Sequence, residues 1–416
     1  MAISLTANER TGANPAPWRS PELYWANLDR VTEGEDPPFG VLQLDALRFN
    51  AHDMIRRASG TPIRIASKSV RVRSILDAAL ALPGFDGVLA YTLPEALWLA
   101  ESIDDVVVGY PTAHRGAIAQ LAESETLASR VTLMVDSPEH LDVIDAVVPP
   151  EKRPAIQVCL ELDASWDAPA PLGRLGTWRS PIHSPQAARS LAEYIVERPG
   201  FELVGMMAYE GQIAGVPDQA AGKAAMNTVV SWVKRRSRAE LMERRGEAVA
   251  LVRDVADLRF VNGGGTGSLE STSNDDSVTE IAAGSGLFAG HLFDGFEAFD
   301  PAPAASFALP VVRKPRHDMA TILGGGWIAS GPPGEERLPK AVWPEGLRMM
   351  PREMAGEVQT PVEGGAAASL ALGDRVWFRH NKSGELSERL NEFLVVDSEG
   401  IVDRVPTYRG EGKAFL

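Results

Sequence analysis

One lysine stands where a side-chain amine could act as a nucleophile. Lys68 directly follows the apolar run IRIAS, which spans residues 63–67. If this run is a strand of a β/α barrel, Lys68 lies at its carboxyl end, where the loops of such a barrel converge on one open mouth. An amine whose pKa is lowered by burial or by neighbouring cations can form a Schiff base with a carbonyl compound. A lysine after a strand is also a common solvated loop residue, so Lys68 needs support from other residues.

Two glycine-rich turns supply that support, because they predict a phosphate site. The run LRFVNGGGTGS (258–268) is typical of a strand that enters a turn of small residues, and AAGSGLF (282–288) has the same form. Backbone N–H groups in such turns can point at an anion, and barrels often hold a phosphate after their seventh and eighth strands. The glycines could instead only permit tight turns, but two such turns favour phosphate binding. The predicted phosphate-binding residues are Gly264, Gly265, Thr266, Gly267, Gly284 and Ser285.

Eight short apolar runs, which alternate with segments of helical periodicity, predict the elements that position these residues. Thr92 and Ser184 are predicted N-caps of two of the helical segments. Strands that are buried on both faces and followed by helices are typical of a parallel sheet, and eight of them predict a closed (β/α)8 barrel; an open doubly wound sheet remains an alternative. The predicted strands are IRIAS (63–67), GVLAY (87–91), DVVVGY (105–110), VTLMVD (131–136), IQVCLEL (156–162), LVGMMAY (203–209), LRFVN (258–262) and EIAAG (280–284).

The pattern changes after Pro301 and predicts a second, smaller C-terminal domain that is all-β. Short alternating runs, separated by Gly, Pro and Asp turns, predict strands there. The Pro/Ala stretch DPAPAAS (300–306) is the predicted linker. We therefore expect an N-terminal tail and lead-in segment over residues 1–30, which could pack on the β domain, a barrel over 31–300 and a β domain over 301–416. The five predicted C-terminal strands are VVRKP (311–315), MATILGG (319–325), DRVWFRH (374–380), EFLVVD (392–397) and GIVDRVP (400–406).

Composition argues against several classes of partner. The chain has 41 basic and 56 acidic residues and a formal net charge of −15, with no dense Lys/Arg block, so we expect no nucleic-acid binding. The apolar runs are short, and residues 1–15 have no apolar signal-peptide core, so we expect a soluble, cytoplasmic protein with no membrane partner. The single cysteine, Cys159, lies inside an apolar run and is predicted to be a buried, inert strand residue.

With Lys68 and the GGGTG and GSG turns in register, the chain resembles the fold type III, alanine racemase-like enzymes that depend on pyridoxal 5'-phosphate (PLP). Within them it resembles the D-threonine aldolase and D-serine dehydratase group. The resemblance implies PLP on Lys68, its phosphate on the two turns, a small D-amino acid as substrate, and a homodimer. LGRLGTW looks like the family's Arg-x-Gly element, which implies that Arg174 lies beside the phenolic oxygen of PLP, and MMAYEGQI implies that Tyr209 contacts the ring. Without the resemblance, Arg174 would be a surface ion pair and Tyr209 a rim aromatic.

The C-terminal run FRHNKSGELSERLNEF resembles a family hairpin in which a His, followed two residues later by Cys or Asp, holds a divalent metal. His380 matches that His, but the second position is Lys382, whose ammonium has no lone pair to donate. Three accounts are open: Zn or Mn on His380 with Glu385 or Glu388, the Lys382 ammonium in place of the metal charge, or an inactive metal site. The second is favoured. The family often has a His where this chain has Gln212.

The resemblance implies one of two reactions at a D-β-hydroxy-α-amino acid. If a base, for which His380 is the first candidate, removes the β-hydroxyl proton, the Cα–Cβ bond breaks to give glycine and an aldehyde. If Lys68 removes the α-proton instead, water leaves, and a keto acid and ammonia follow. The second route normally needs a Lewis-acidic metal, so the aldolase is favoured. A non-catalytic PLP-binding protein, or a barrel enzyme that binds a phosphorylated sugar without PLP, is a further alternative.

Overall fold

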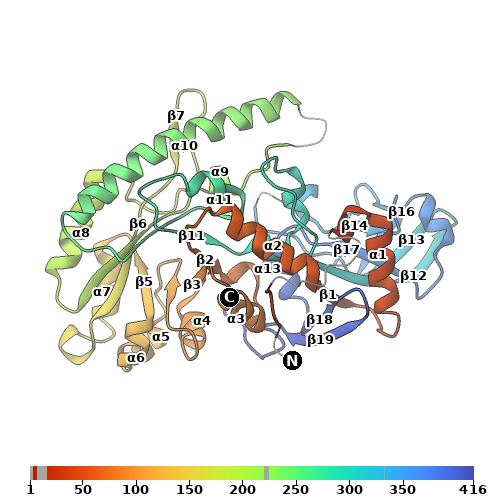
Figure 1. Cartoon of the computed structure of the whole chain (residues 1–416), viewed down its shortest axis with the longest axis horizontal. Helices are drawn as coiled ribbons and strands as arrows, with labels where there is room; N and C mark the ends of the chain where they lie inside the picture. The colour runs from red at the N-terminus through yellow and green to blue at the C-terminus, as the bar shows by residue number, and fades with distance from the viewer. Residues whose placement is uncertain (1–2, 7–15, 220–223, 332) are drawn as a thin grey trace.

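The two main sheets of the described residues, a closed barrel and an open second sheet, lie side by side (Figure 1). The computed structural model describes residues 3–6, 16–219, 224–331 and 333–416. Residues 1–2 and 7–15 of the predicted N-terminal tail and lead-in segment therefore lie outside the described residues. No helix within these described ranges is long and apolar enough to cross a bilayer.

The barrel has eight parallel strands in the closed order β2-β3-β4-β5-β6-β9-β10-β11. All eight match the predicted runs, so the (β/α)8 barrel is confirmed and the open doubly wound sheet is excluded. Each strand is almost entirely buried, which explains its continuous apolar sequence. The strands are β2 (Ile63–Ala66), β3 (Phe85–Ala90), β4 (Val106–Val108), β5 (Val131–Val135), β6 (Ile156–Glu161), β9 (Phe201–Ala208), β10 (Phe260–Gly263) and β11 (Glu280–Ala283).

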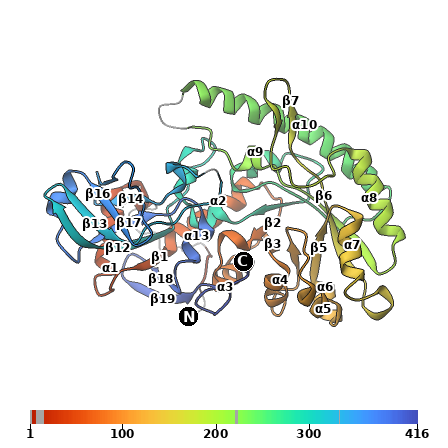
Figure 2. The same cartoon turned by 180° about the vertical axis from the view of Figure 1, so that it is seen from behind.

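Helices follow the barrel strands and cover the barrel's outer face (Figures 1 and 2). Thr92 and Ser184 are N-caps, as predicted, because their side chains accept the backbone N–H groups of Glu95 and Ala187. A short hairpin, β7 (Trp166–Ala168) with β8 (Gly173–Leu175), projects between β6 and the next helix. The helices of this part are α2 (Leu44–Arg57), α3 (Arg73–Leu80), α4 (Leu93–Leu99), α5 (Arg115–Ala122), α6 (Glu125–Arg130), α7 (Pro138–Asp145), α8 (Pro185–Glu197), α9 (Gly211–Ala214), α10 (Ala224–Arg253), α11 (Leu269–Thr272) and α12 (Ser285–Phe288).

The second sheet has nine strands and confirms the predicted C-terminal β architecture. All five predicted C-terminal strands form. Four further strands were not predicted, and one of them, β1 (Phe39–Gln43), comes from the N-terminal part of the chain. It lies between β12, with which it is antiparallel, and β18, with which it is parallel. The other strands are β12 (Ala305–Arg316), β13 (Met319–Leu323), β14 (Lys340–Trp343), β15 (Arg348–Met349), β16 (Gln359–Glu363), β17 (Arg375–Arg379), β18 (Glu392–Val396) and β19 (Ile401–Pro406).

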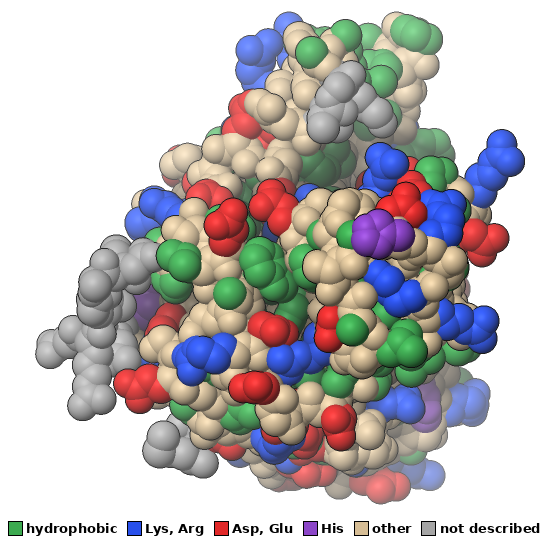
Figure 3. Space-filling model, turned by 90° about the vertical axis from the view of Figure 1, so that its right-hand side faces the viewer, with side chains coloured by type: hydrophobic (Ala, Val, Ile, Leu, Met, Phe, Trp, Pro, Cys, Tyr) green, Lys and Arg blue, Asp and Glu red, His purple; other side chains and the backbone are tan. Residues whose placement is uncertain are grey.

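The first helix, α1 (Pro21–Val31), packs on this second sheet. The indole N–H of Trp377 donates to the carboxylate of Asp29 at 3.0 Å, and the rings of Trp25 and Trp377 lie 6.3 Å apart. The surface of this end of the molecule carries acidic and basic side chains intermixed (Figure 3). The division of the chain into domains at residues 30 and 300 stays a prediction.

Candidate active site

Lys68 lies at the open mouth of the barrel and is joined there to a tyrosine. The lysine occupies a one-turn 3-10 helix, Ser67–Ser69, directly after β2, and its side chain is exposed. Its Nζ donates a hydrogen bond to the hydroxyl of Tyr110 at 2.8 Å. Tyr110 follows β4, so two barrel strands place the pair. Burial alone would raise the pKa of Tyr110, but the charge and hydrogen bond of Lys68, with the charge of Arg179, hold it below its ordinary value.

Arg179 joins this pair to Tyr209, the residue predicted at the end of β9. The guanidinium carbon of Arg179 lies 5.5 Å from the ring centroids of both Tyr110 and Tyr209. Arg174 is not brought to them. It lies in β8, where its guanidinium forms an ion pair with Asp167 at 2.6 Å. The predicted contact of Arg174 with a cofactor stays a prediction, and Arg179, five residues further along the same segment, is the arginine that faces the mouth.

The two glycine turns predicted to bind phosphate meet each other beside the Lys68 turn. The hydroxyl of Thr266 accepts hydrogen bonds from the Ser285 hydroxyl and the Gly286 N–H, both at 3.0 Å, so Thr266 links the loop after β10 to the loop after β11. A Cβ atom on Gly284 would collide with the backbone oxygen of Ala66, two residues before Lys68. The glycine therefore lets these loops pack directly on the strand that carries the lysine.

A buried carboxylate supports the first of these turns. Gly264 has a φ of +77°, a conformation that favours glycine, and its N–H donates to Glu210 at 2.8 Å. Thr272 and Arg245 also donate to this carboxylate, at 2.6 and 3.3 Å. In addition, a Cβ on Gly267 would collide with the backbone oxygen of Ala214. The buried Glu210 carboxylate thus fixes this turn, and neighbouring atoms leave no room for a side chain at Gly264 or Gly267.

Two further carboxyl groups, which the sequence reasoning missed, end the neighbouring strands. Cys159 and Met134 belong to the apolar cluster inside the barrel. Because strand side chains alternate, Glu161 and Asp136, two residues further along, point to the same interior at the mouth. Burial, with the charge of Asp136, raises the pKa of Glu161 to about 7, although Arg179 opposes the shift. Burial also raises the pKa of Asp136, against the charge of His140. Glu161 can therefore hold a proton near neutral pH.

Lys382 faces the mouth, whereas His380 does not. Lys382 is half-buried, and burial followed by the charges of Arg337, Lys68 and Arg179 lowers the pKa of its amine. His380 is fully buried, and burial, Arg379 and His291 lower its pKa to about 3. The imidazole is thus neutral. The groups that act on it include none of those at the mouth.

The side chains near His380 do not fit a divalent metal. Glu385 accepts the backbone N–H of Lys382, and Glu388 forms an ion pair with Arg71. Within the described part of the chain, no group of three or more His, Cys, Asp or Glu side chains could hold a metal ion.

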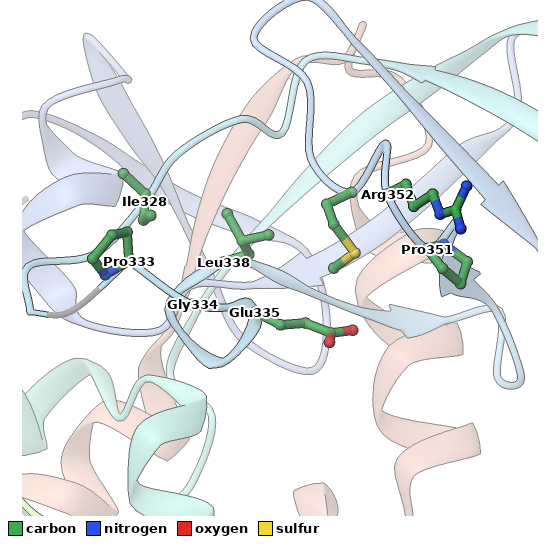
Figure 4. Close-up of a pocket in the computed structure, with 8 residues that line it drawn as sticks. Ile328, Pro333, Gly334, Glu335, Leu338, Pro351 and Arg352 are labelled. Atoms are coloured by element: carbon green, nitrogen blue, oxygen red, sulfur yellow. The ribbon is translucent and has the colours of Figure 1, made fainter.

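Cys159 and Gln212 are buried and contact only other residues of the fold. Cys159 is fully buried, and burial raises the pKa of its thiol well above the ordinary value, which fits an inert residue. The amide of Gln212 donates to the backbone of Ala164 and to Ser237, at 2.7 and 2.9 Å. A separate cavity of about 500 Å³ lies among loops of the second sheet, between the segments 328–338 and 351–354 (Figure 4). None of the predicted site residues lines that cavity.

Comparison with known families agrees with this geometry. Residues 42–245 match the family model described as alanine racemase, N-terminal domain. This segment belongs to that family. In members of the alanine racemase family PLP is the implied cofactor, which is the chemistry that the exposed Lys68 and the glycine turns suit.

Two kinds of relative refine the likeness. A 3-hydroxy-D-aspartate aldolase from Paracoccus denitrificans (strain Pd 1222) is 26% identical over 262 residues, which are 60% of each chain. The match thus spans about 60% of the length of the curated relative. Among solved structures, D-threonine aldolase from Filomicrobium marinum superposes with a TM-score of 0.73 at 18% identity, over 91% of this chain and 96% of its own. D-threo-3-hydroxyaspartate dehydratase from Delftia sp. HT23 gives 0.67 at 19% identity, over 90% and 97%. At these identities the structures establish the fold, including the second sheet. The comparisons therefore place residues 42–245 in the alanine racemase N-terminal domain family and give the whole chain the same fold as this aldolase and dehydratase.

Proposed function

We propose that this protein is a PLP-dependent lyase that cleaves a D-3-hydroxy-α-amino acid into glycine and an aldehyde. The observation that carries the proposal is the Lys68 amine, exposed at the barrel mouth, bonded to Tyr110 and packed beside both glycine turns. The D-configuration follows the names of the related aldolases and dehydratase. The same resemblance supports a homodimer, which light scattering would test.

The residues present fit PLP. The first turn of a helix can point backbone N–H groups at a phosphate, and Thr266–Ser268 and α12 both begin in the glycine turns. The N–H groups of Gly264 and Gly286 are not among those offered, because they donate to Glu210 and Thr266. The glycines keep the turns free of side chains, since a Cβ on Gly267 or Gly284 would strike backbone oxygens. Lys68 would hold the cofactor covalently, and the bound PLP would supply an electron sink for the bond that breaks at the α-carbon.

The side chains of this chain then handle protons and charge. Tyr110, whose pKa is lowered beside Lys68, can pass a proton to and from the lysine amine over their 2.8 Å hydrogen bond. Arg179, over the rings of Tyr110 and Tyr209, can stabilise an oxyanion at the mouth. Glu161, with a pKa of about 7, is a second group that can accept the proton of a substrate hydroxyl. We favour Tyr110 and Glu161 over His380 for this role because they face the mouth.

The charges at the mouth favour a substrate with an acidic side chain. Four cationic side chains lie near one another here. The pKa of Lys382 is lowered by the charges of the other three, Arg337, Lys68 and Arg179. Asn381 holds the Arg337 loop to the Lys382 segment, since its amide donates to the backbone of Glu336 at 2.7 Å. The Nε and Nη1 atoms of Arg337 are buried without a hydrogen-bond partner in the described structure. A second carboxylate on the substrate would neutralise this cluster, as in the 3-hydroxyaspartate named for the curated relative.

The test is product analysis with the purified protein, PLP and EDTA. D-3-hydroxyaspartate, D-threonine, D-phenylserine and D-serine are incubated separately, and aldehyde, keto acid, glycine and ammonia are each measured. Equal amounts of aldehyde and glycine without ammonia are expected. Keto acid with ammonia would move the assignment to a dehydratase, and activity that returns only with added Mn or Zn would reveal a metal site. Binding of PLP without turnover of any substrate would favour a carrier protein.

A matched variant tests the role of Lys68 itself. Lys68→Ala removes the amine, so it is expected to lose both activity and the absorbance band of lysine-bound PLP at about 420 nm. Lys152→Ala, at an exposed lysine in the segment that precedes β6, is the control and is expected to keep both. Activity in Lys68→Ala would overturn the assignment.

A further inference from the structure

The turn that carries Lys68 rests on a fully buried carboxyl group. Glu95, in α4, is 0% exposed. One of its carboxylate oxygens accepts the N–H of Tyr91 at 2.7 Å, and the other accepts the hydroxyl of Tyr408 at 3.0 Å. The hydroxyl of Ser67, the residue directly before Lys68, donates to the carbonyl oxygen of Leu89 at 3.1 Å and helps to lower the pKa of the Glu95 carboxyl. A buried carboxylate with two donors, Tyr91 and Tyr408, thus lies next to the residue that precedes Lys68.

The C-terminal segment closes over the same turn from the other side. Tyr408 is 1% exposed, and its N–H donates to the carbonyl oxygen of Arg71 at 2.9 Å. Ser387 donates to the carbonyl oxygen of Val70 at 2.7 Å. A Cβ atom on Gly384 would lie 2.7 Å from the carbonyl oxygen of Lys68. Residues more than 300 positions away therefore hold the backbone from Lys68 to Arg71, and the C-terminus lies beside α3 in both views (Figures 1 and 2).

Burial of the Glu95 carboxyl lowers the stability of the fold, which a contact with a purely structural role would not require. A buried ionisable group loses its hydration, and apolar residues of similar volume usually fill such a site at lower free energy. Burial raises the pKa of Glu95 to about 7, and Ser67, Tyr91 and Tyr408 oppose the shift. Ser67 directly precedes Lys68, and the backbone of Tyr408 is bonded to that of Arg71.

We infer that Glu95 and Tyr408 are positioning residues that fix the Lys68 turn for the proposed reaction. Neither side chain reaches the mouth: Glu95 accepts the Tyr408 hydroxyl, and the Tyr408 N–H donates to the backbone of Arg71, at the end of the Lys68 turn. A reactive amine must be held to about 0.5 Å for efficient chemistry, and supporting hydrogen bonds provide that precision. The inference rests on the proposed function, because it assumes that the Lys68 amine is the group that binds PLP.

Several charged and titratable groups face this pair. Arg71 acts on Glu95 across the turn, and its guanidinium lies 4.8 Å from the ring of Tyr91. Glu388, from the segment after α13 (Ser383–Ser387), pairs with Arg71 and acts on Tyr91. On the outer side Arg73 pairs with Glu411, near Asp77, and Lys413 lies 5.5 Å from the Trp98 ring that packs on Tyr408. Loss of the Tyr408 hydroxyl would raise the pKa of Glu95 further and leave it neutral.

The experiment compares two variants with a matched control in the PLP-loaded protein. Tyr408→Phe deletes the hydroxyl, and Glu95→Gln is a neutral replacement of the same size. Tyr24→Phe is the control, because the Tyr24 hydroxyl is also buried and donates at 2.8 Å, but to Pro303 in the second domain. The measurements are kcat, KM, thermal unfolding and the pH midpoint of the band of lysine-bound PLP at about 420 nm.

We expect Tyr408→Phe and Glu95→Gln to lower kcat at least tenfold with KM within twofold, and to lower the pH midpoint of the band. Tyr24→Phe is expected to lose a similar amount of stability while kcat and the midpoint stay at wild-type values. If Tyr408→Phe does not fold, Glu95→Gln decides by the same criteria. Values of kcat and midpoint equal to those of Tyr24→Phe would overturn the inference. A wild-type protein that never shows the band would instead refute the proposed function.

Discussion

Substitution of one glycine tests whether the close packing of the last barrel strand on the lysine strand matters for catalysis. In Gly284→Ala the new methyl group would collide with the backbone oxygen of Ala66 and lie 3.1 and 3.2 Å from its carbonyl carbon and nitrogen. Backbone atoms cannot rotate away, so one strand end must shift by about 1 Å to restore ordinary carbon contacts. Overpacking of this kind costs about 1–3 kcal/mol of unfolding free energy.

The shift would be transmitted to Lys68, which follows Ala66 by two residues. A displacement of about 1 Å at a reacting group can lower the rate about a hundredfold. We therefore expect Gly284→Ala to fold, to bind PLP more weakly in an absorbance titration, and to lose about two orders of magnitude in kcat. Gly246→Ala is the matched control, because a Cβ there meets nothing within 4 Å and a helical Gly→Ala change should stabilise by about 0.5–1 kcal/mol. A folded Gly284→Ala protein with wild-type kcat would refute the reasoning.

Three further results are expected. Arg179→Ala should lower kcat at least a hundredfold, as loss of an oxyanion donor does, while Arg174→Ala, which loses only an exposed ion pair, should keep near wild-type kcat; the opposite order would restore Arg174 as the cofactor contact. Lys382→Met should raise KM for D-3-hydroxyaspartate about tenfold more than KM for D-threonine, whereas the exposed Lys340→Met should change neither; equal effects on both substrates would argue against an acidic subsite. Glu161 has a folded pKa of about 7, above the ordinary 4.5, so the folded state binds more protons between those values and the unfolding free energy should fall as pH rises from about 5 to about 8. Glu161→Gln should flatten that fall in urea titrations, and an unchanged slope would contradict the shift.

The barrel was predictable from sequence because its strands are buried on both faces and therefore form unbroken apolar runs. The strand FGVLQ has the same composition, and it was missed as a member of the second sheet because its partners β12 and β18 lie more than 260 residues further along the chain. Periodicity carries no information on pairing at that distance. The extra strands β14 to β16 were missed because they are only four, two and five residues long, and β16 also contains Pro361.

The parts of the site that depend on the backbone, namely strand ends and glycine turns, could be predicted from sequence. The parts that depend on the direction of a side chain could not. Lys68 and the glycine turns could be identified, since strand ends and glycines are visible in sequence. Tyr110 is the last residue of the predicted strand DVVVGY, and Glu161 is the last but one of IQVCLEL; strand alternation applied near those ends could have found them. Arg179 could not be separated from Arg174, because only the fold shows which of two nearby arginines turns inward.

The insertion of β1 into the second sheet also constrains synthesis of the chain. Ribosomes add about 5–20 residues per second, so about 20–70 s pass between the emergence of β1 and that of β18, its parallel partner. Until β12, the antiparallel partner of β1, emerges more than 260 residues later, the apolar Val41 and Leu42, both 0% exposed in the finished protein, have no strand to pair with, and they lack their second partner until β18 follows. The nascent chain must keep this segment from aggregating, by chaperone binding or by transient packing, until the last strands arrive. A circular permutation that moves residues 16–43 behind the C-terminus would place β1 after its partners and shorten that exposure.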